Sequence, residues 1–342
     1  MSAAASKHML SVNLVYGTYG ESGILTSIKN TQKMLRLLES EGVRFYQNSI
    51  RICDVMHAHT FGPIALLLAL LHKARHKAVI IHTHTTPQDV ANSYFGANFI
   101  SACLKGYLGF FYNLADVCIA PSAYTKEVLK STLNIKRRIA VLSNGIDLSL
   151  YECDEKRAAK FKAEHALNDR PLVLSIGLVF VRKGISDFVD AAKKLPRFRF
   201  VWVGRILTWP FLPKAAKNVL EAAPENVLFT GRVNSICEAL SAADVFVFPS
   251  YEENQGIAAL EAAACGVPLI LRDLPAYSDF IDGHNCVKFT TAKEFRSAIN
   301  EVITNQARAT RLGENARKTV QNHDVHVVSK KLLQVYLAAK RD

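Results

Sequence analysis

Two glutamates stand eight positions apart in residues 253–261 (ENQGIAALE), with a glycine between them. The preceding residues 244–250 (DVFVFPS) are typical of a buried strand. Glu253 is then expected in a loop, and Glu261 in the first turns of a helix that begins near Gly256. A helix start offers free backbone N–H groups and the positive end of the helix dipole, which suit a diphosphate. Carboxylates on either side accept hydrogen bonds from sugar hydroxyl groups, so the segment indicates a nucleotide sugar as ligand.

The same two glutamates also have a purely structural interpretation. Glutamate is favoured in the first turn of any helix, and a glutamate in a loop is ordinarily solvated. For an isolated pair of this spacing the structural interpretation is the stronger one. The functional interpretation is favoured here because further motifs stand in a matching order around the pair.

Length and composition describe a folded protein with a large core. The chain has 342 residues, enough for about two domains, and 49% of them are hydrophobic. The seven cysteines are scattered and none has the spacing of a zinc ligand set, so reduced, buried thiols in a cytosolic protein are expected. Residues 1–10 (MSAAASKHML) contain no long apolar stretch, so no signal peptide is expected.

The formal net charge of +12 favours anionic partners: phosphates, nucleic acids or an anionic membrane surface. More than half of the excess positive charge falls in residues 1–148. The sequence contains no zinc-finger spacing, aromatic RNA-binding motif or basic repeat, so nucleic acid is not expected as a partner. The composition does not indicate an oligomeric state.

Two apolar stretches bear on membrane contact. Residues 65–71 (ALLLALL) are too few to span a bilayer and run into the basic residues 72–77 (HKARHK). A core helix that ends in cations is favoured; the alternative is a partly exposed helix whose basic end meets anionic headgroups. Residues 94–112 are rich in aromatic side chains, but Lys105 and three glycines argue against a span. They predict either an amphipathic helix pair lining a hydrophobic acceptor cleft or a part of the core.

Strand and helix patterns alternate along the chain, with a glycine-rich turn at residues 17–23 and a polar connection at 148–170. Short apolar strands are predicted on both sides of the connection, most of them followed by a loop and a helix. The predicted strands are 10–16, 55–57, 78–82, 117–120, 139–142, 172–176, 199–204, 227–230, 245–249 and 268–271. The predicted helices are 24–40, 125–132, 185–194, 236–242, 258–264, 292–304 and 323–340.

Strands separated by helices of this length predict parallel sheets with helices on both faces, arranged as two Rossmann-like units. Ligands bind such sheets at the carboxyl ends of the strands, where the loops cluster. Residues suited to ligand binding or catalysis fall at those strand ends in both halves of the chain; they are Gly23, His57, His82, Gly177 and Glu253.

Four segments carry a resemblance to a known family: residues 143–147 (SNGID), 175–184 (SIGLVFVRKG), 227–233 (VLFTGRV) and 244–266. With them the chain resembles the family 4 glycosyltransferases over nearly its whole length. The resemblance implies the GT-B fold, an α/β architecture of two facing Rossmann-like domains with parallel sheets and an active site in the cleft between them.

The resemblance also implies a division of labour between the two domains. Residues 1–148, joined by a C-terminal crossover helix at about 323–342, are expected to bind the acceptor. Residues 149–322 are expected to bind the nucleotide-sugar donor.

A narrower resemblance is to bacterial glucosyltransferases that act on diacylglycerol or monoglucosyl-diacylglycerol. It is carried by residues 81–89 (IHTHTTPQD), 111–116, 177–184, 250–253 (SYEE) and 272–277 (RDLPAY). It implies a retaining hexosyltransferase that moves glucose from a UDP-sugar to a lipid acceptor. Such an enzyme is cytoplasmic and peripheral on the inner face of the cell membrane.

The family's phosphate-binding positions match a basic pair in this chain. Lys183 matches the lysine that holds the donor diphosphate, and Arg182 stands beside it. Many members carry an arginine directly after the glycine that Gly177 matches; here Leu178 occupies that place, and Arg182 is expected to supply the missing charge. The structural alternative is an exposed helix entry.

Other donor contacts follow from the same resemblance. Glu253 matches the glutamate that contacts the donor sugar hydroxyls near the reacting carbon, and Glu261 the one that binds the ribose hydroxyls. Gly23 matches the glycine that lets the first domain approach the donor phosphates, although Ser22 replaces the more usual glycine before it. The remaining predicted contacts are backbone groups: Gly256, Ile257 and Ala258 for the diphosphate, and Arg232 and Val233 for the base.

A histidine of the first domain contacts the sugar near the reaction centre in this family. His84 matches best by its following residues, and His82 is the close alternative. His57 and His59 are expected to be structural. Four histidines at two strand ends suggest a metal, but the family holds the diphosphate with cations and helix N–H groups, so no metal or other cofactor is expected.

The resemblance implies front-face transfer, in which the acceptor attacks from the side that the nucleoside diphosphate leaves. Two alternatives stay open. One is a transferase with a soluble saccharide or polysaccharide precursor as acceptor. The other is a catalytically silent nucleotide-sugar-binding protein; Leu178 is its only support, and the intact Glu253, Glu261 and Lys183 count against it.

Overall fold

The structure is a computed structural model of the whole chain. It describes residues 9–17, 23–90, 97–167, 169–206 and 214–340, without the side chains of 89–90 and 97–102. The chain divides into two compact units. The first comprises Met1–Pro87, Ile100–Gly145 and His323–Asp342, and the second comprises Gln88–Phe99 and Ile146–Asn322. The predicted boundary near residue 148 and the functions expected of the two halves stay predictions.

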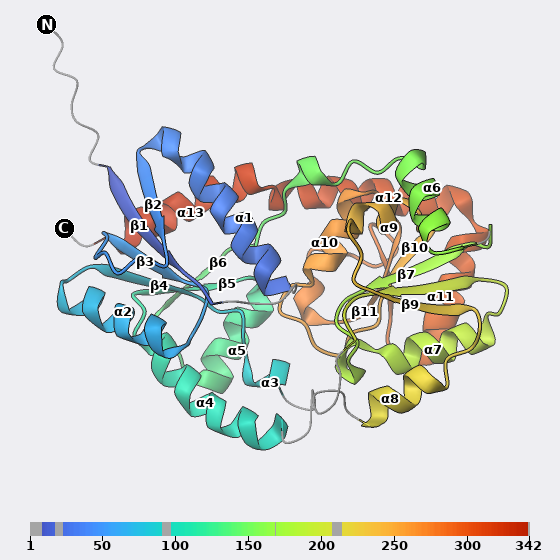
Figure 1. Cartoon of the computed structure of the whole chain (residues 1–342), viewed down its shortest axis with the longest axis horizontal. Coiled ribbons are helices and arrows are strands. Elements are labelled where there is room, and N and C mark those ends of the chain that lie inside the picture. Colours follow the sequence, from blue (N-terminus) through green and yellow to red (C-terminus); the bar gives the residue numbers. More distant parts are fainter. Residues whose placement is uncertain (1–8, 18–22, 91–96, 168, 207–213, 341–342) are drawn as a thin grey trace, which may run out of the picture. The chain divides into compact units, whose positions relative to one another are not determined.

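The first unit is a six-stranded sheet in the order β2-β1-β3-β4-β5-β6, with all neighbouring strands parallel. Its strands are β1 (Leu10–Val15), β2 (Val43–Gln47), β3 (Val55–Ala58), β4 (Ala78–His82), β5 (Val117–Ala120) and β6 (Arg138–Val141). Its helices are α1 (Gly23–Leu37), α2 (Pro63–Ala74), α5 (Ala123–Leu133), α13 (Val325–Ala339) and most of α4 (Ala97–Asn113), with the short η1 (Leu38–Glu41) (Figure 1). The short α3 (Pro87–Val90) begins at the last residue of this part of the first unit and continues into the second.

Both faces of this sheet are covered, because successive side chains of a strand point to opposite sides. Val12, Ile80 and Ile119 pack against α1 and α13 on one face. Met56 and Ile81 pack against α2, α4 and α5 on the other (Figure 1). A strand buried on both faces reads as a continuous apolar run, which is why the central strands were predictable.

The chain leaves and re-enters the first unit at neighbouring points. Ser143 precedes the exit, and its hydroxyl group is hydrogen-bonded to Nδ1 of His323 at 2.9 Å. Asn30 of α1 donates a hydrogen bond to the carbonyl of Gly145 at 2.7 Å. The SNGID segment therefore fastens α1 and the returning C-terminal segment to the first unit.

The second unit repeats the design, with the strand order β12-β11-β10-β7-β8-β9 and all neighbours parallel. Its strands are β7 (Leu172–Ile176), β8 (Arg199–Val203), β9 (Val227–Gly231), β10 (Val245–Phe248), β11 (Leu269–Arg272) and β12 (Val287–Phe289). Its helices are α6 (Glu155–Glu164), α7 (Ile185–Lys194), α8 (Lys214–Glu221), α9 (Ile236–Ser241), α10 (Ile257–Ala264), α11 (Ala292–Thr304) and α12 (Gln306–Thr319). Short 3₁₀ turns are η2 (Leu148–Leu150), η3 (Val181–Lys183), η4 (Pro275–Tyr277) and η5 (Val320–His323).

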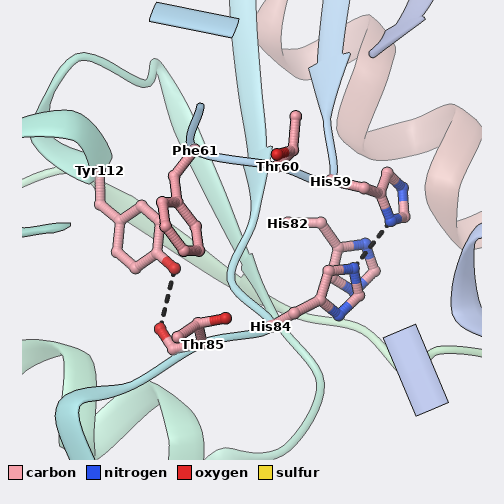
Figure 2. Close-up of a pocket in the computed structure, with 7 residues that line it drawn as sticks. All are labelled: His59, Thr60, Phe61, His82, His84, Thr85 and Tyr112. Carbon is pink, nitrogen blue, oxygen red and sulfur yellow. Dashed lines mark hydrogen bonds between the residues drawn. The ribbon is translucent and has the colours of Figure 1, made fainter. Parts of the chain in front are cut away.

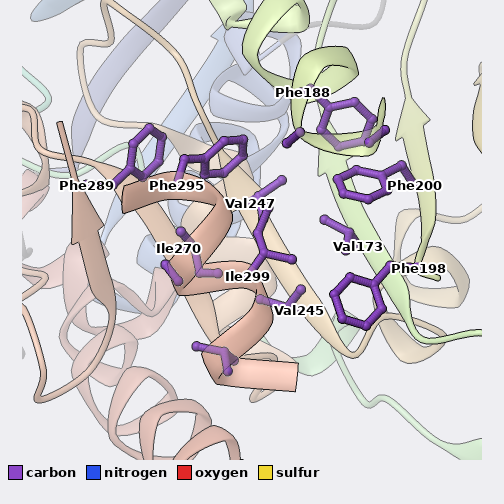
Figure 3. Packing of buried hydrophobic residues seen from close by; sticks show 14 of the residues in the cluster. Val173, Phe188, Phe198, Phe200, Val245, Val247, Ile270, Phe289, Phe295 and Ile299 are labelled. Atoms are coloured by element: carbon purple, nitrogen blue, oxygen red, sulfur yellow. The ribbon is translucent and has the colours of Figure 1, made fainter. Parts of the chain in front are cut away.

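The core of the second unit lies between its sheet and the helices α7 and α11 (Figure 3). Val245 and Val247 face this core from β10. The Phe188 ring of α7 lies edge-on to the rings of Phe200 and Trp202, with centroids 5.2 and 5.1 Å apart. The alternate β10 side chains turn to the opposite face, so Phe248 points away from this cluster.

The strand orders reverse at one place in each sheet. From β1 the chain first goes to β2 on one side and then to β3 on the other; from β7 it goes to β8 and β9 and then to β10. Loops that leave such neighbouring strands in opposite directions open a crevice at the carboxyl edge of the sheet. The loops after β7 and β10 are those that carry residues 177–184 and 249–256.

The prediction of two Rossmann-like units with parallel sheets is confirmed. The strands β2 and β12 were missed, and both are edge strands, whose partly exposed side chains weaken the apolar pattern. The helices α3, α6, α8 and α12 were also missed. Residues 148–170 were predicted as a connection, yet α6 forms there and buries only Phe161 among its side chains.

Two apolar stretches differ from expectation. The core interpretation of residues 65–71 is wrong for half of α2: Leu67, Leu70 and Leu71 are exposed, together with Ile64. The stretch at 94–112 does not form a helix pair from Ala97 on, because a single helix runs to Asn113. In the described part of the chain, no helix combines the length and the apolar character that crossing a bilayer requires.

The expectation that the cysteines are reduced thiols is wrong for two of them. Cys153 and Cys265 form a disulfide, although 112 residues separate them in the sequence. The fold brings their Cα atoms to 5.5 Å, within the range for such a bond.

Gly204 lies directly against Gly177 where β8 and β7 end, so a side chain at Gly204 should lower the stability of the protein. Its φ is +151°, and a Cβ atom there would lie 1.9 Å from the carbonyl oxygen of Gly177. We expect Gly204→Ala to lower the free energy of unfolding by about 3 kcal/mol, because backbone atoms must shift. Gly231→Ala is the matched control: its φ is +69°, nothing lies within 4 Å of the added atom, and the expected loss is about 1 kcal/mol.

Urea unfolding followed by tryptophan fluorescence measures both variants, because the buried Trp202 belongs to this unit. Equal losses of stability in the two variants would contradict the steric argument.

Candidate active site

The loops after β7 and β10 bring two of the predicted site residues together. Lys183 ends η3, and its ammonium group forms a hydrogen-bonded ion pair with Oε1 of Glu253, 70 residues later. Both side chains are largely buried, at 16% and 10% exposure. Glu253 is therefore not a solvated loop residue, and the structural interpretation made for an isolated glutamate does not hold.

The contact between these loops requires a glycine. Gly184 follows Lys183 with φ at +80°, and a Cβ atom there would lie 2.2 Å from the carbonyl oxygen of Pro249. Only glycine lets the turn before α7 lie directly on the end of β10. Lys183 Nζ also lies 5.5 Å from the centroid of the Phe248 ring, which adds a cation–π contact.

Arg182 forms hydrogen bonds with the backbone of the loop after β10. Its Nη1 donates to the carbonyl oxygen of Glu252 at 2.8 Å, and its own carbonyl accepts from the N–H of Tyr251 at 2.9 Å. Arg182 thus stabilises the loop that carries Glu253. Leu178, which stands where many family members have arginine, is half-buried.

Helix α10 begins at the end of this loop. Its N-cap Gly256 has φ at +76°, and a Cβ atom there would lie 2.7 Å from the Tyr277 ring and 3.1 Å from the Phe248 ring. Ile257 and Ala258 open the helix, and first-turn N–H groups have no partner within a helix. The helix start thus lies next in the chain to Glu253, with its dipole able to attract an anion.

Glu261 lies one turn into α10 and is 4% exposed. Burial raises its pKa to about 7, and a hydrogen bond from the hydroxyl group of Tyr151, 2.8 Å from Oε1, opposes the rise. Burial and the neighbouring Glu261 raise the pKa of Tyr151. A carboxyl group in this environment is poised to accept hydrogen bonds when it is ionised.

Sequence reasoning missed three hydroxyl groups around these carboxylates. Tyr151 lies in a segment read as a connection, so nothing marked it. Tyr277 and Ser250 are buried, and within the described part of the chain neither hydroxyl group has a hydrogen-bond partner. Burial, followed by the charge of Glu253, raises the pKa of Tyr277. Both residues lie in segments noted for their family resemblance, which was the available signal.

The predicted base-reading residues follow an edge strand. Arg232 and Val233 come directly after β9; Arg232 is exposed and Val233 is half-buried. In the sheet order, β8 separates β9 from the β7 loop that carries Lys183.

The first unit gathers four histidines at the ends of the neighbouring strands β3 and β4 (Figure 2). His59 Nδ1 lies 2.8 Å from His84 Nε2, and the His82 and His84 rings stack with centroids 4.3 Å apart. His57 Nδ1 is hydrogen-bonded to the hydroxyl group of Tyr336 on α13 at 2.8 Å. His84 is half-buried, whereas the other three are buried; which of His82 and His84 contacts a sugar stays a prediction.

Burial keeps these imidazoles uncharged. It lowers the pKa of His57 and of His84 to about 3, and it holds the pKa values of His59 and His82 well below the ordinary range. A small hollow beside them is lined by His59, Thr60, Phe61, His82, His84, Thr85 and Tyr112 (Figure 2). Neutral imidazoles in such a place can donate or accept hydrogen bonds with a sugar.

Ligand atoms of His57, His59 and His82 lie within 4.8 Å of one another. The rings of His57 and His82 are nearly parallel, 9° apart, with centroids 5.6 Å apart. An imidazole lone pair lies in the ring plane, so stacked rings do not aim at one common point. The arrangement favours a stacked cluster over a set of metal ligands.

Gly23 is the first residue of α1 and is exposed. Residues 18–22 of the predicted glycine-rich turn lie outside the described residues, as does Ser22 among them.

Two family descriptions match the chain. Residues 21–150 match Glycosyltransferase Family 4, and residues 156–319 match Glycosyl transferases group 1. Over 308 residues the chain is 32% identical to the processive diacylglycerol alpha-glucosyltransferase of Acholeplasma laidlawii, covering 88% of this chain and 90% of that protein. It is 27% identical to the alpha-galactosylglucosyldiacylglycerol synthase of Streptococcus pneumoniae, covering 83% and 76% of the two chains.

Solved structures share the fold at low sequence identity. Sucrose-phosphate synthase from Thermosynechococcus elongatus superposes with a TM-score of 0.78 at 17% identity, over 96% of this chain and 98% of that one. Anabaena Alr3699/HepE in complex with UDP-glucose gives a TM-score of 0.76 at 16% identity, over 96% and 100%.

The raised pKa of Glu261 predicts a pH dependence of stability. The folded pKa of about 7 exceeds the ordinary value of 4.5, so the stabilising contribution is fully present below pH 4.5 and is lost as the pH rises through 7. Relative to Glu261→Gln, the wild type should lose on the order of 3 kcal/mol of unfolding free energy across that window.

Urea unfolding of both proteins at several pH values between 4.5 and 8 measures this difference. Glu221→Gln on α8 is the control, since that side chain is 63% exposed. Parallel stability profiles for the wild type and Glu261→Gln would contradict the assignment.

Proposed function

Because this chain belongs to the glycosyltransferases of family 4 and group 1, we propose that it transfers glucose from UDP-glucose to a lipid acceptor with retention of configuration. Diacylglycerol or a glycosyl-diacylglycerol is the proposed acceptor. The observation that carries the proposal is the buried pair of Lys183 and Glu253 beside the start of α10. It unites a cation suited to a diphosphate with a carboxylate suited to sugar hydroxyl groups.

The donor is held by the second unit in this proposal. Lys183, Arg182 and the N–H groups of Gly256, Ile257 and Ala258 neutralise the diphosphate, without a metal. Glu253 accepts hydrogen bonds from the sugar, and Glu261 from the ribose. The backbone of Arg232 and Val233 contacts the base, and Gly23 of the first unit leaves room for the phosphates.

The chemical step depends on the leaving group. The bond between C1 of glucose and the β-phosphate oxygen breaks, and UDP leaves with the bonding electrons. The acceptor hydroxyl oxygen bonds to C1 on the same face and gives its proton to the departing phosphate. Lys183 and the α10 dipole stabilise the charge that develops on UDP, and His84 orients the sugar through a hydrogen bond.

The lipid acceptor is supported by the surface of α2. Its buried side carries Ala65, Leu68, Ala69 and His72, while Ile64, Leu67, Leu70 and Leu71 are between 43% and 74% exposed. Exposed apolar side chains along one helix are costly in water unless they meet an apolar surface. We propose that this row enters the headgroup region of a membrane.

Basic residues stand at the C-terminal end of this apolar row. Arg75 and His76 follow the end of α2 and are exposed. Cations near an apolar insertion favour anionic lipid. We therefore propose a peripheral position on the inner, cytoplasmic face of the cell membrane.

Donor turnover in the presence and absence of vesicles tests the proposal. UDP release from UDP-glucose should depend on vesicles that contain diacylglycerol and anionic lipid, and a glucosylated lipid should form. A panel of UDP- and GDP-sugars establishes the donor. Donor hydrolysis without a lipid product, at equal rates with and without vesicles, would overturn the lipid acceptor.

In the same assay, Lys183→Ala and Glu253→Ala should each lower turnover about 100-fold or more, because each removes a contact to the donor. Far-ultraviolet circular dichroism checks folding, and Glu253→Gln keeps the shape of the side chain while removing its charge. The exposed pair Lys193 and Asp190 on α7 provides the control Lys193→Ala. Unchanged turnover in all the site variants would contradict the site.

The α2 surface makes a separate prediction. Leu67→Asp combined with Leu71→Asp should weaken binding to anionic vesicles about tenfold, because two apolar contacts are lost and two negative charges are added. Co-sedimentation with vesicles measures the binding, and Leu337→Asp on α13, 56% exposed, is the control. Equal vesicle binding by all the proteins would exclude this surface.

A further inference from the structure

Three cysteines from distant parts of the second unit form a cluster. Cys153 follows η2, Cys237 lies in α9, and Cys265 caps α10. Their Sγ atoms all lie within 4.8 Å of one another. Cys153 and Cys265 form the disulfide, and Sγ of Cys237 lies 3.6 Å from Sγ of Cys153. A free thiol thus stands in contact with a disulfide.

We propose that Cys153, Cys237 and Cys265 form a thiol–disulfide exchange centre that small-molecule disulfides modify, and that its oxidation weakens donor binding through Tyr151 and Glu261. The second part of this proposal rests on the proposed function; the first part does not.

The exchange conserves electrons within the protein. The Cys237 thiolate bonds to Sγ of Cys153, the bond between Cys153 and Cys265 breaks, and Cys265 leaves as a thiolate that takes up the proton. Formation of the disulfide from two thiols needs an oxidant. A small-molecule disulfide supplies it, since it takes two electrons and two protons from the cysteines and becomes two thiols.

The surroundings of the cluster suit this chemistry. Cys153 and Cys265 are half-buried and Cys237 is 7% exposed, so the disulfide is the more accessible part. Arg157 Nη1 lies 3.3 Å from Sγ of Cys237. Burial raises the pKa of Cys237, and Arg157 opposes the rise. Exchange should therefore accelerate as the pH rises above neutrality, because the thiolate is the nucleophile.

The cluster adjoins the carboxyl group proposed to bind ribose. The N–H of Cys265 donates to the carbonyl oxygen of Glu261 at 3.2 Å, one helical turn away. Two residues before Cys153, the hydroxyl group of Tyr151 is hydrogen-bonded to Oε1 of Glu261. The segment from Tyr151 to Cys153 is thus fastened to α10 at two points, one covalent and one hydrogen-bonded.

The covalent fastening controls how readily Tyr151 leaves Glu261. In the oxidised protein the disulfide holds Tyr151 on the carboxylate oxygen that a ribose hydroxyl group needs. Reduction removes the covalent link, so Tyr151 can give way at lower cost. The loss of one hydrogen bond to a competitor corresponds to about fivefold in affinity.

Disulfide mapping by mass spectrometry tests the exchange centre without reference to function. After treatment with oxidised glutathione at pH 8.5 and alkylation, the wild type should show the linkages 153–265 and 153–237. Cys265→Ser should show only 153–237, and Cys103→Ser, which alters an exposed cysteine outside the cluster, should match the wild type. Recovery of Cys237 only as an alkylated thiol in both the wild type and Cys265→Ser would overturn the exchange.

Calorimetric titration with UDP tests the coupling. Reduced wild-type protein should bind UDP about fivefold more tightly than the oxidised protein, and this difference should vanish in Cys153→Ser and in Tyr151→Phe. Equal affinity of the two redox forms would overturn the coupling. Absence of UDP binding in both forms would instead refute the proposed function, and the mapped linkages would still decide the exchange centre.

Discussion

The ion pair between Lys183 and Glu253 is the interaction on which the loops after β7 and β10 of the second unit depend. Taking two charges out of water is costly unless they meet at short range, so the turn after β7 and the loop after β10 must be held in one arrangement. Gly184 permits that approach, and Arg182 secures the loop backbone. The same loop then delivers the start of α10 next to the pair.

The two units differ in the charge of the groups that they hold at the carboxyl edges of their sheets. Both present loops at a reversal of strand order, where ligands of such sheets bind. The second unit holds charged groups there. The first unit holds buried imidazoles whose pKa values lie well below neutrality, anchored by Tyr336 from the returning C-terminal helix. Charged side chains suit ionic ligands, and neutral imidazoles suit hydroxyl groups.

Glu261 shows how the fold can change the meaning of a residue that the sequence marked. An exposed glutamate on a helix would have an ordinary pKa. Burial instead raises the pKa of Glu261 to about 7, and the hydroxyl group of Tyr151 donates a hydrogen bond to its carboxylate. The nearby disulfide ties the segment of Tyr151 to the same helix. A carboxyl group, a phenol and three sulfur atoms from separate stretches of the chain thereby lie close together.

The sequence by itself determined the class of fold, because the central strands are buried on both faces and read as apolar runs between helices. It missed the edge strands β2 and β12, whose mixed burial weakens that pattern, and the polar helix α6. It also indicated Lys183 and Glu253 as candidate site residues, each separately and without their contact. Only the tertiary structure decided that these two meet, that α2 exposes half of its apolar side chains, and that Tyr151 and three cysteines surround the end of α10. Contacts between residues 70 to 112 positions apart are set by how strands are ordered in a sheet, and local sequence carries no record of that order.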